Sequence, residues 1–538
     1  MRDVDKHIDL CKLHRNLRET KNDVRYKITN VCFSTNRVIY KIKIKHKMLT
    51  TALFVAVATT ALFLLCIYIH RKTASLPGPW NLPILGCLHK LDTKLPYLTL
   101  TELAQKYGPI YSIKLGLLEA VVISDAKLLK KILVKDEALG RPPMYVFSGV
   151  FKGKGIAYAP MHLWRDQRKF VSNFLRTSGA AKFSSKKKTL ENIIKKYVEE
   201  FMELLNSQGE KTNLNPSEAI GNYVISVAST MFLGKSFNRG DKIRKTLLDS
   251  YDKVTKLLAV GGPINFLPFL RFLPQYKHTI SSLTKYVEDV HHIQNQCIEM
   301  AEKCSSNNSE DEYLNLIEAF FQQKLKCDSE EIYNTEQLQF LLFDVFGASI
   351  ETTSNTLFWI LLYLAKYQNV QNKVRNELNN VLQNKSLQME DLQNLPYTHA
   401  TISEVSRIRT VVPLGFPHYA LEDIQIENFK IPKGSMILSL LWAIHMDQKF
   451  WKNPEEFSPD RFLDDEGRFL QLEAFLPFQT GKRMCVGEEL GKMMMFLFVA
   501  TVVKNFKIEA CNSGDVDFSP ICGLTLLPKP QELVFIKI

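Results

Sequence analysis

The chain has 538 residues, of which 46% are hydrophobic and 23% are charged. This is the composition of an ordinary globular protein, and it excludes a long disordered or low-complexity chain. The net charge of +13 is concentrated in residues 1–47, which hold 13 Lys or Arg and 5 Asp or Glu. Because the rest of the chain shows no basic stripe and no nucleic-acid-binding module, we expect no nucleic-acid partner.

The ten cysteines are scattered along the chain, without a C-x-x-C pair and without the spacing of a zinc site. A framework of disulfides is not expected in so long a chain. The cysteines therefore favour a reducing, cytosolic environment for the main domain.

Residues 48–70 are predicted to form an uncleaved transmembrane anchor. Met48–Ile69 contains 22 residues without a charge, and as a helix this segment would span about 33 Å, enough to cross a bilayer. His70, Arg71 and Lys72 end it. A cleaved signal peptide is the alternative, but the apolar run is long for one and no small-x-small cleavage site follows it.

Residues 1–47 form a basic extension that conflicts with this topology. Under the positive-inside rule its lysines would keep the N-terminus in the cytosol and send the main domain to the lumen. A start at Met48 removes the conflict, so we predict that Met48 is the working start and that 1–47 is either a dispensable extension or one wrongly assigned to the protein. Residues 71–86 contain the prolines Pro77, Pro79 and Pro83 and are predicted to be a stiff linker before a domain at 87–538.

Helical periodicity dominates the region after the linker. Apolar residues recur at helical spacing, and the few strand-like stretches are short. There is no internal repeat and no flexible linker that would divide the region. We therefore predict one domain that is mainly α-helical with small β-sheets. The expected helices lie at 181–206, 241–260, 277–303 and 311–326, and the expected strands at 110–115, 120–123, 424–426 and 436–439.

One helix is expected to run from Asn334 and Thr335, which are good capping residues, to about Tyr367. It is apolar on nearly every side, so it should pass through the core. Yet its middle contains Asp344 and the run Glu351-Thr352-Thr353. A buried carboxylate is costly unless it is paired or used, so these residues are either a locally satisfied polar cluster or a functional one.

Near the C-terminus a short loop, Phe478 to Gly487, holds a single cysteine, Cys485. Gly481 and Gly487 allow sharp turns, and Phe478 provides apolar cover. Arg483 places a positive charge nearby, which favours a thiolate, as does the start of a helix expected from about Glu488. These features alone are compatible with a nucleophile, a redox sensor or a metal ligand.

The loop matches F-x-x-G-x-R-x-C-x-G at every fixed position and so resembles the heme-binding loop of cytochromes P-450. Further signatures of that family follow in the same order, and the resemblance covers about residues 75–538. It is closest to the microsomal clan that holds xenobiotic and steroid hydroxylases. One departure is Ser349, where the family has glycine in its oxygen-binding helix. The other signatures are Trp164 with Arg168 (W-x-x-x-R), Ala348 to Thr353, Glu404 with Arg407 (E-x-x-R) and Pro459-Asp460-Arg461-Phe462.

The resemblance implies the cytochrome P-450 fold and a heme b cofactor whose iron is bound by Cys485. It implies that the propionates of the heme are bound by Trp164, Arg168, His418 and Arg483. Phe478, Gly481 and Gly487 of the cysteine loop would also bind the cofactor. Thr352 would hydrogen-bond oxygen and Glu351 would help to bring in protons, whereas Glu404, Arg407 and Arg461 would form a structural network.

The implied function is that of a monooxygenase that hydroxylates a lipophilic small molecule with O₂. A faint likeness to arthropod hydroxylases suggests a sterol or ecdysteroid precursor. Electrons would come from NADPH through NADPH–cytochrome reductase, with a cytochrome b-type protein as a further donor. The basic residues Arg165, Lys169 and Lys482 either face that reductase or are simply solvated.

The enzyme would then be a single-pass protein of the endoplasmic reticulum membrane, with its catalytic domain in the cytosol. Apolar residues 261–270 would either dip into the lipid near a substrate entrance or form an aromatic-rich stripe of the core. Two alternatives remain open. One is a heme-thiolate isomerase or dehydratase that needs no reductase, although such enzymes often lack the threonine that stands here at Thr352. The other is a non-catalytic heme-binding sensor.

Overall fold

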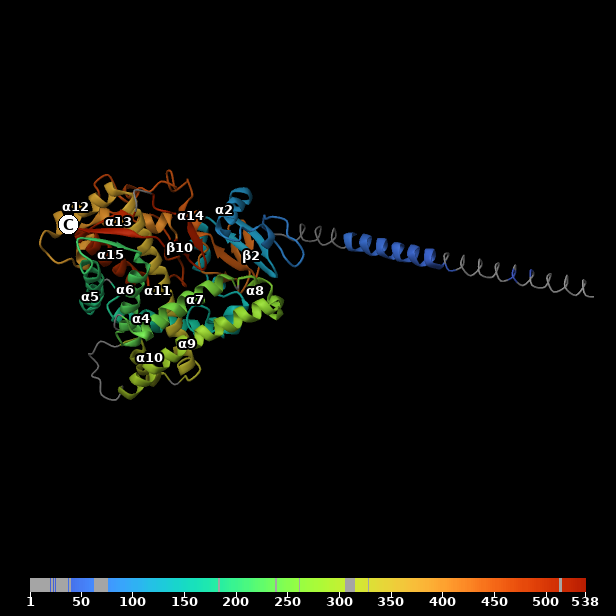
Figure 1. Ribbon diagram of the computed structural model, residues 1–538, viewed down its shortest axis with the longest axis horizontal. Helices are drawn as coiled ribbons and strands as arrows, with labels where there is room; N and C mark the ends of the chain where they lie inside the picture. Colours follow the sequence, from blue (N-terminus) through green and yellow to red (C-terminus); the bar gives the residue numbers. More distant parts are fainter. Residues whose placement is uncertain are drawn as a thin grey trace, which may run out of the picture. The chain divides into compact units, whose positions relative to one another are not determined.

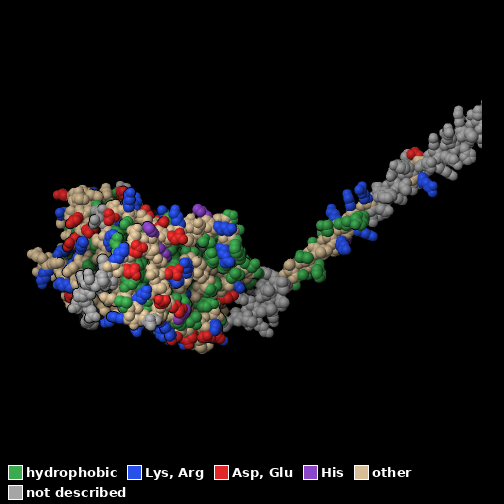
Figure 2. Space-filling view, turned by 90° about the horizontal axis from the view of Figure 1, so that it is seen from below, with side chains coloured by type: hydrophobic (Ala, Val, Ile, Leu, Met, Phe, Trp, Pro, Cys, Tyr) green, Lys and Arg blue, Asp and Glu red, His purple; other side chains and the backbone are tan. Residues whose placement is uncertain are grey.

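The computed structural model describes residues 20, 23, 25, 37, 40–61, 76–181, 184–237, 240–260, 262–304, 315–327, 329–511 and 515–538. The chain divides into two compact units, Met1–Ser75 and Leu76–Ile538. In the first unit residues 40–61 are helical and exposed. In Figure 2 lysine side chains gather on one part of this helix and hydrophobic side chains on the adjoining part.

The predicted anchor, 48–70, lies only in part within the described residues, because 62–70 fall outside them. Among the residues that the structure describes, no helix combines the length and the apolar character that a membrane crossing requires.

The second unit is mainly helical, as predicted, with small sheets (Figure 1). The α-helices are α2 (Pro96–Tyr107), α3 (Ala126–Leu133), α4 (Met161–Thr177), α5 (Lys187–Asn206), α6 (Pro216–Ala228), α7 (Lys242–Val260), α8 (Gly262–Phe266), α9 (Pro274–Cys304), α10 (Leu316–Lys326), α11 (Thr335–Lys366), α12 (Gln368–Leu382), α13 (Pro396–Ile408), α14 (Leu441–His445) and α15 (Glu488–Asn505). Short 3₁₀ or π turns are η1 (Leu88–Lys90), η2 (Asp136–Ala138), η3 (Val146–Val150), η4 (Ser229–Leu233), η5 (Pro268–Phe272), η6 (Met389–Asn394) and η7 (Pro459–Phe462).

The strands form one four-stranded sheet in the order β1-β2-β7-β4, one three-stranded sheet in the order β3-β11-β8, and two hairpin pairs, β5-β6 and β9-β10. Figure 1 shows β2 at one end of the unit and α5 and α12 at the other. The strands are β1 (Ile110–Leu115), β2 (Leu118–Ile123), β3 (Lys211–Leu214), β4 (His418–Tyr419), β5 (Ile424–Ile426), β6 (Phe429–Ile431), β7 (Met436–Ser439), β8 (Phe506–Ala510), β9 (Pro520–Cys522), β10 (Leu526–Pro528) and β11 (Leu533–Lys537).

Helix α11 passes through the core, as its apolar sequence predicts. The side chain of Asn334 caps it by accepting a hydrogen bond from the Gln337 amide at 2.8 Å. It packs against α6, α9, α15 and β8, and most of its side chains are buried. The helix is continuous from Thr335 to Lys366. It therefore provides a rigid wall along which the polar residues in its middle are placed.

Candidate heme-thiolate site

The loop that holds Cys485 closes on itself through backbone hydrogen bonds. The Cys485 amide donates to the Phe478 carbonyl at 3.0 Å, and the Met484 amide donates to the Gly481 carbonyl at 3.2 Å. Helix α15 then begins at Glu488, with Gly487 as its N-cap residue. The cysteine therefore lies directly before a helix N-terminus, as the sequence predicts, where the helix dipole favours an anion.

The two glycines of the loop serve different purposes. Gly481 has a φ of +83°, and a Cβ there would lie 2.2 Å from the Leu133 carbonyl oxygen, so only glycine fits. Gly487 has an ordinary φ of −93°, and a Cβ there would meet no atom of the described chain within 4 Å. The conformation and packing of the backbone thus require glycine at position 481. At position 487 glycine is not required by the polypeptide, and its lack of a side chain leaves space beside the cysteine.

Opposing effects act on the pKa of Cys485. Its side chain is solvent-accessible, although it lies deep in the fold. Burial is the largest effect and raises the pKa above the ordinary value of a thiol, and the charge of Glu488 adds to this. A hydrogen bond from the Gly487 amide and the charges of Arg168 and Lys492 lower it. The sequence analysis assigned the nearby positive charge to Arg483. The structure adds a further arginine, Arg168 of α4, whose charge lowers this pKa.

Arginine side chains gather around this loop from distant parts of the sequence. Arg168 donates from Nη1 to the Met484 carbonyl at 2.7 Å. The guanidinium of Arg483 lies 4.3 Å from the ring centroid of Trp164 and donates from Nη2 to the Ala159 carbonyl at 3.1 Å. The structure therefore brings together the residues of the W-x-x-x-R signature and the arginine of the cysteine loop.

Arg141 and His418 complete this group. Arg141 donates to the carbonyls of Ala157 (2.9 Å) and Pro417 (2.7 Å). His418 is fully buried, and its Nδ1 lies 2.8 Å from the Ala138 carbonyl. Burial and the charges of Arg141 and Arg483 lower the pKa of His418 to about 3, so the ring is neutral at physiological pH.

Arg141, Arg168 and Arg483, called here the cationic cluster, have no acidic partner among the described residues, and the neutral His418 lies beside them. None of them forms an ion pair with a carboxylate in the part of the chain that the structure describes. Nε and Nη1 of Arg483 are buried without a hydrogen-bond partner, and so is Nε2 of His418, which has Gln479 nearby. Burial, followed by the charges of Arg141 and Arg168, lowers the pKa of Arg483 to about 8. Such a cluster requires an anion to neutralise it.

Three features suit a cofactor that carries carboxylates: a cysteine at a helix N-terminus, space beside Gly487, and an arginine cluster in which Arg483 has unpaired nitrogens. The family model for cytochrome P450 matches residues 76–535. The chain belongs to the cytochrome P450 family. Members of this family bind heme b, and they are monooxygenases.

Characterised P450s from several animals are similar to this chain over most of their length. Cytochrome P450 306a1 of Drosophila melanogaster is 32% identical over 86% of this chain and 89% of its own. Cytochrome P450 2K4 of Oncorhynchus mykiss is 30% identical over 90% and 98%, respectively. Cytochrome P450 2J3 of Rattus norvegicus is 32% identical over 88% and 94%.

The face of α11 that bears Thr352 contains its most accessible middle residues. Ala348 is exposed and Thr352 is partly accessible, although the helix around them is largely buried. These two residues are four apart and lie on one helix face. The Thr352 hydroxyl donates to the Ala348 carbonyl at 2.7 Å.

Ser349, the departure from the family pattern, turns its hydroxyl back onto its own helix. The hydroxyl lies 2.7 Å from the Val345 carbonyl and 3.0 Å from the Phe346 carbonyl. The added oxygen is therefore satisfied within α11. Ser349 lies within the continuous span of α11, Thr335–Lys366.

The two buried carboxyls of α11 have different partners. Asp344 accepts hydrogen bonds from the amides of Ile156 (2.7 Å) and Ala157 (2.8 Å), and burial raises its pKa to about 6. Glu351 accepts from the Thr525 hydroxyl at 2.6 Å, and burial raises its pKa to about 6 as well. Asp344 thus fastens the loop before α4 to α11, whereas Glu351 contacts the C-terminal part of the chain.

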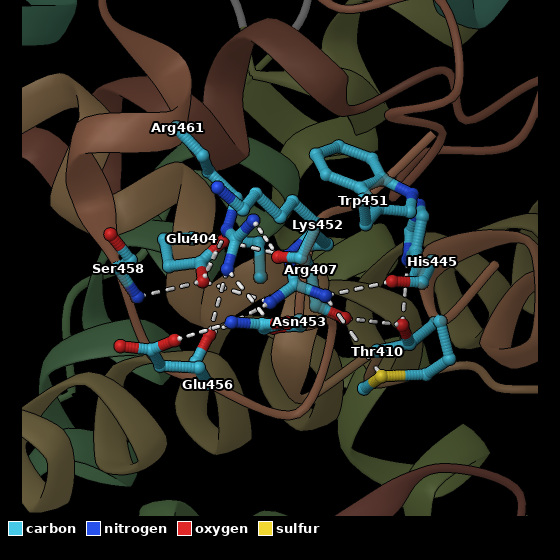
Figure 3. A network of polar contacts seen from close by, with 12 residues as sticks. Glu404, Arg407, Thr410, His445, Trp451, Lys452, Asn453, Glu456, Ser458 and Arg461 are labelled. Carbon is cyan, nitrogen blue, oxygen red and sulfur yellow. Dashed lines mark hydrogen bonds and ion pairs between the residues drawn. The ribbon is translucent and has the colours of Figure 1, made fainter. Parts of the chain in front are cut away.

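A separate buried network lies around Glu404 (Figure 3). Arg407 grips the Glu404 carboxylate with two hydrogen bonds, of 2.7 and 2.8 Å, and Arg461 adds a third at 2.9 Å. Further donors from both arginines reach backbone carbonyls, including that of His445 at 2.8 Å. The predicted structural network of Glu404, Arg407 and Arg461 is therefore confirmed.

Arg141 and Thr525 are the polar residues near this site that the sequence analysis missed. Arg141 stands in a Gly-Arg-Pro-Pro run that reads as a simple turn, and Thr525 in a Gly-Leu-Thr-Leu run without periodicity. In principle, a charged residue between glycine and proline in an otherwise apolar stretch is a signal. The partners of both residues are far away in sequence and could not be inferred.

Proposed function

We propose that Cys485 is the proximal ligand of the heme iron and that this P450 hydroxylates a lipophilic small molecule with electrons from NADPH. The observation that carries the proposal is the cationic cluster beside the cysteine loop. Trp164, Arg168, His418 and Arg483, the residues expected to hold the propionates, lie in or against this cluster, and Arg141 joins them. Arginine forks suit carboxylates particularly well.

When bound, the heme supplies oxygen activation, promoted by its thiolate ligand. The side chains of this chain would orient the cofactor, exclude water and deliver protons. The arginines would fix the orientation of the cofactor, and the apolar wall of α11 would exclude water. Thr352 would present its hydroxyl to oxygen, and Glu351 would carry protons toward it.

The substrate that we propose is lipophilic because the region around Asp344 is lined with aromatic side chains. Phe151 and Tyr251 both pack against Phe343, with ring centroids 5.5 and 5.2 Å apart, and Phe147 packs against Tyr158. A sterol or ecdysteroid precursor is the candidate to test first. The insect relative and the rat relative are equally similar in identity, so the comparison does not favour one substrate class over another.

Contact with a membrane is supported by exposed apolar side chains on neighbouring segments. Leu117, Phe269 and Phe272 are 53%, 49% and 63% exposed. The Leu117 amide donates to the Phe266 carbonyl at 2.9 Å, which joins the β1–β2 turn to the segment of α8 and η5. Figure 2 shows hydrophobic side chains gathered at this end of the unit. We propose that this patch contacts the endoplasmic reticulum membrane, with residues 48–70 as a single anchor and the catalytic unit in the cytosol.

We propose NADPH–cytochrome reductase as the electron donor, with a cytochrome b-type protein as a second one. Arg165, Lys169 and Lys482 would form the docking face. Asp136 lies within it, 2.6 Å from the Lys482 ammonium and 3.7 Å from the Arg165 guanidinium. Because these side chains are about half exposed, each pair adds little stability and can exchange for an acidic partner.

The test is turnover of the reconstituted protein with sterols, terpenoids and fatty acids. We expect hydroxylated product only when NADPH, reductase and O₂ are all present. Thr352→Ala should divert electrons to peroxide, whereas Thr352→Ser, which keeps the hydroxyl, should not. Conversion of a lipid peroxide without reductase would instead support the isomerase or dehydratase alternative. A heme-thiolate spectrum without any product would support the sensor.

A further inference from the structure

The carboxyl of Glu351 is held on the side of α11 that faces the C-terminal part of the chain. Consecutive helical residues point about 100° apart, so Glu351 does not share the accessible face of Thr352. Its carboxylate instead accepts the hydroxyl proton of Thr525 at 2.6 Å. Thr255 of α7 also lies beside the carboxyl.

A third residue leaves the single proton of the Thr525 hydroxyl free for Glu351. The Asn355 side-chain amide lies 3.2 Å from Thr525 Oγ1, and an amide nitrogen can only donate. When Glu351 is charged it has no proton to donate, so the Thr525 hydroxyl is the donor of this hydrogen bond. The contact therefore stabilises the charged form of the carboxyl and opposes the effect of burial.

Thr525 itself is rigidly placed. It is 2% exposed, and its carbonyl accepts from the Gly523 amide at 2.9 Å. The neighbouring Leu526 is fastened twice, by its amide to the Val411 carbonyl at 2.7 Å and by its carbonyl to the Trp359 indole at 3.0 Å. A side chain held this firmly can set the position of a more flexible glutamate.

Charged groups near Glu351 lie toward the solvent. Asp252 of α7 raises the pKa of Glu351, and the Lys256 ammonium lies 2.6 Å from Asp252. Asp252 and Lys256 are both more than half exposed. Glu351 thus stands between an exposed polar pair on α7 and the face of α11 that bears Thr352.

We infer that Thr525 is a positioning residue of the proton path, which holds the Glu351 carboxyl between solvent and the oxygen site and sets the pH at which it gives up its proton. This inference rests on the proposed role of Glu351 as proton carrier. The carboxyl must leave Thr525 to deliver its proton, and it returns to Thr525 once charged, because only the charged form accepts the full strength of that hydrogen bond.

The first test is an infrared titration of the Glu351 carboxyl in the folded holoenzyme, with Glu351→Gln identifying the band. In Thr525→Val, which keeps the shape but loses the hydroxyl, Glu351 should stay protonated to a pH about one unit higher. Thr525→Ser should restore the behaviour of the parent. An identical titration in all three proteins would overturn the inference.

The second test is the pH dependence of coupling, measured as product formed for each NADPH consumed. Coupling should fall as Glu351 loses its proton, and in Thr525→Val this fall should occur about one pH unit higher, with KM unchanged. A shifted infrared titration with an unshifted coupling profile would remove Thr525 from the proton path. A lack of any reductase-dependent product in the parent would contradict the proposed function itself, while the infrared titration would still test the contact.

Discussion

Two buried groups of charges lie in this P450, and they are built on opposite principles. In the network of Glu404, Arg407 and Arg461, a carboxylate is surrounded by donors and its charge is neutralised within the protein (Figure 3). In the cationic cluster the arginines form no ion pair with a carboxylate of the described chain, and two nitrogens of Arg483 have no hydrogen-bond partner there.

The difference separates structural charge from functional charge. A neutralised network stabilises only if it stays complete, because removing one partner leaves the other buried and unpaired. A buried cluster of charges of one sign destabilises the protein without its ligand, and a ligand of the opposite charge stabilises it. Changes to the charges around the arginines should therefore affect mainly the stability of the fold in the first group and mainly cofactor binding in the second.

The largest effect is expected from Glu404→Gln. Arg407 would then be buried without a counter-charge, at a cost of about 3–5 kcal/mol in the free energy of unfolding. Denaturant unfolding of the holoenzyme measures it. Glu422→Gln is the matched control, since its Lys433 partner lies at the surface and the loss should stay below about 1 kcal/mol. Equal effects of the two changes would contradict the assigned difference between buried and exposed pairs.

Arg483→Gln should act on the cofactor instead of the fold. Loss of one charged hydrogen bond to a propionate, worth about 1.5–3 kcal/mol, should speed heme loss by about 10- to 100-fold. Transfer of heme to an apo-globin acceptor measures this rate. The denaturant midpoint should change less than in Glu404→Gln. If heme loss were unchanged, the cluster would not be a propionate site.

The two glycines of the cysteine loop show the same contrast between a residue that serves the fold and one that serves the cofactor. Gly481→Ala should destabilise the fold by about 1–2 kcal/mol or more, because alanine is strained at positive φ and meets the Leu133 carbonyl. Gly487→Ala meets no atom of the described chain, so unfolding should be little affected while heme binding weakens. Comparison of the unfolding midpoint and the heme content of each variant tests this. Full heme content in Gly487→Ala would show that the space beside residue 487 does not serve the cofactor.

A smaller effect is expected at Asp344, where a buried carboxyl is satisfied by amides alone. Its folded pKa of about 6 lies above the ordinary value of 3.8, so the folded state keeps a proton that the unfolded state has released. This group therefore lowers stability as pH rises from about 4 to 6, by up to about 2 kcal/mol.

Asp344→Asn keeps an oxygen that can accept from Ile156 and Ala157 but removes the titration. The variant should be more stable relative to the parent at pH 6.5 than at pH 4.5, as measured by denaturant midpoints. A constant difference between the two proteins across this range would contradict the raised pKa.

Local features of the sequence were the most predictable. The cap at Asn334 and the span of α11 follow from side-chain chemistry within a few residues. The strands 110–115, 424–426 and 436–439 have the predicted bounds. By contrast, β11 pairs with β3 and β8, in a register that sets Leu533 opposite Leu214. Short strands joined over such distances leave no periodic signal.

The sequence predicted those residues of the site that stand in a recognisable motif. The cysteine loop, Trp164 and Arg168 stand in recognisable patterns, whereas Arg141 and Thr525 act through contacts that only the fold creates. The charge near Cys485 illustrates the limit: proximity in sequence pointed to Arg483 alone, and only the fold brings Arg168 of α4 to the sulfur. Sequence distance is a poor guide to electrostatic distance.

The most direct test of the central claim is the reduced carbonyl spectrum of the protein with serine at position 485 (Cys485→Ser) beside the parent. The parent should show the absorption band characteristic of thiolate-ligated heme. The variant should lose that band, whether it retains heme through the cationic cluster or not. A variant with the same band as the parent would contradict the assignment of Cys485 as the iron ligand.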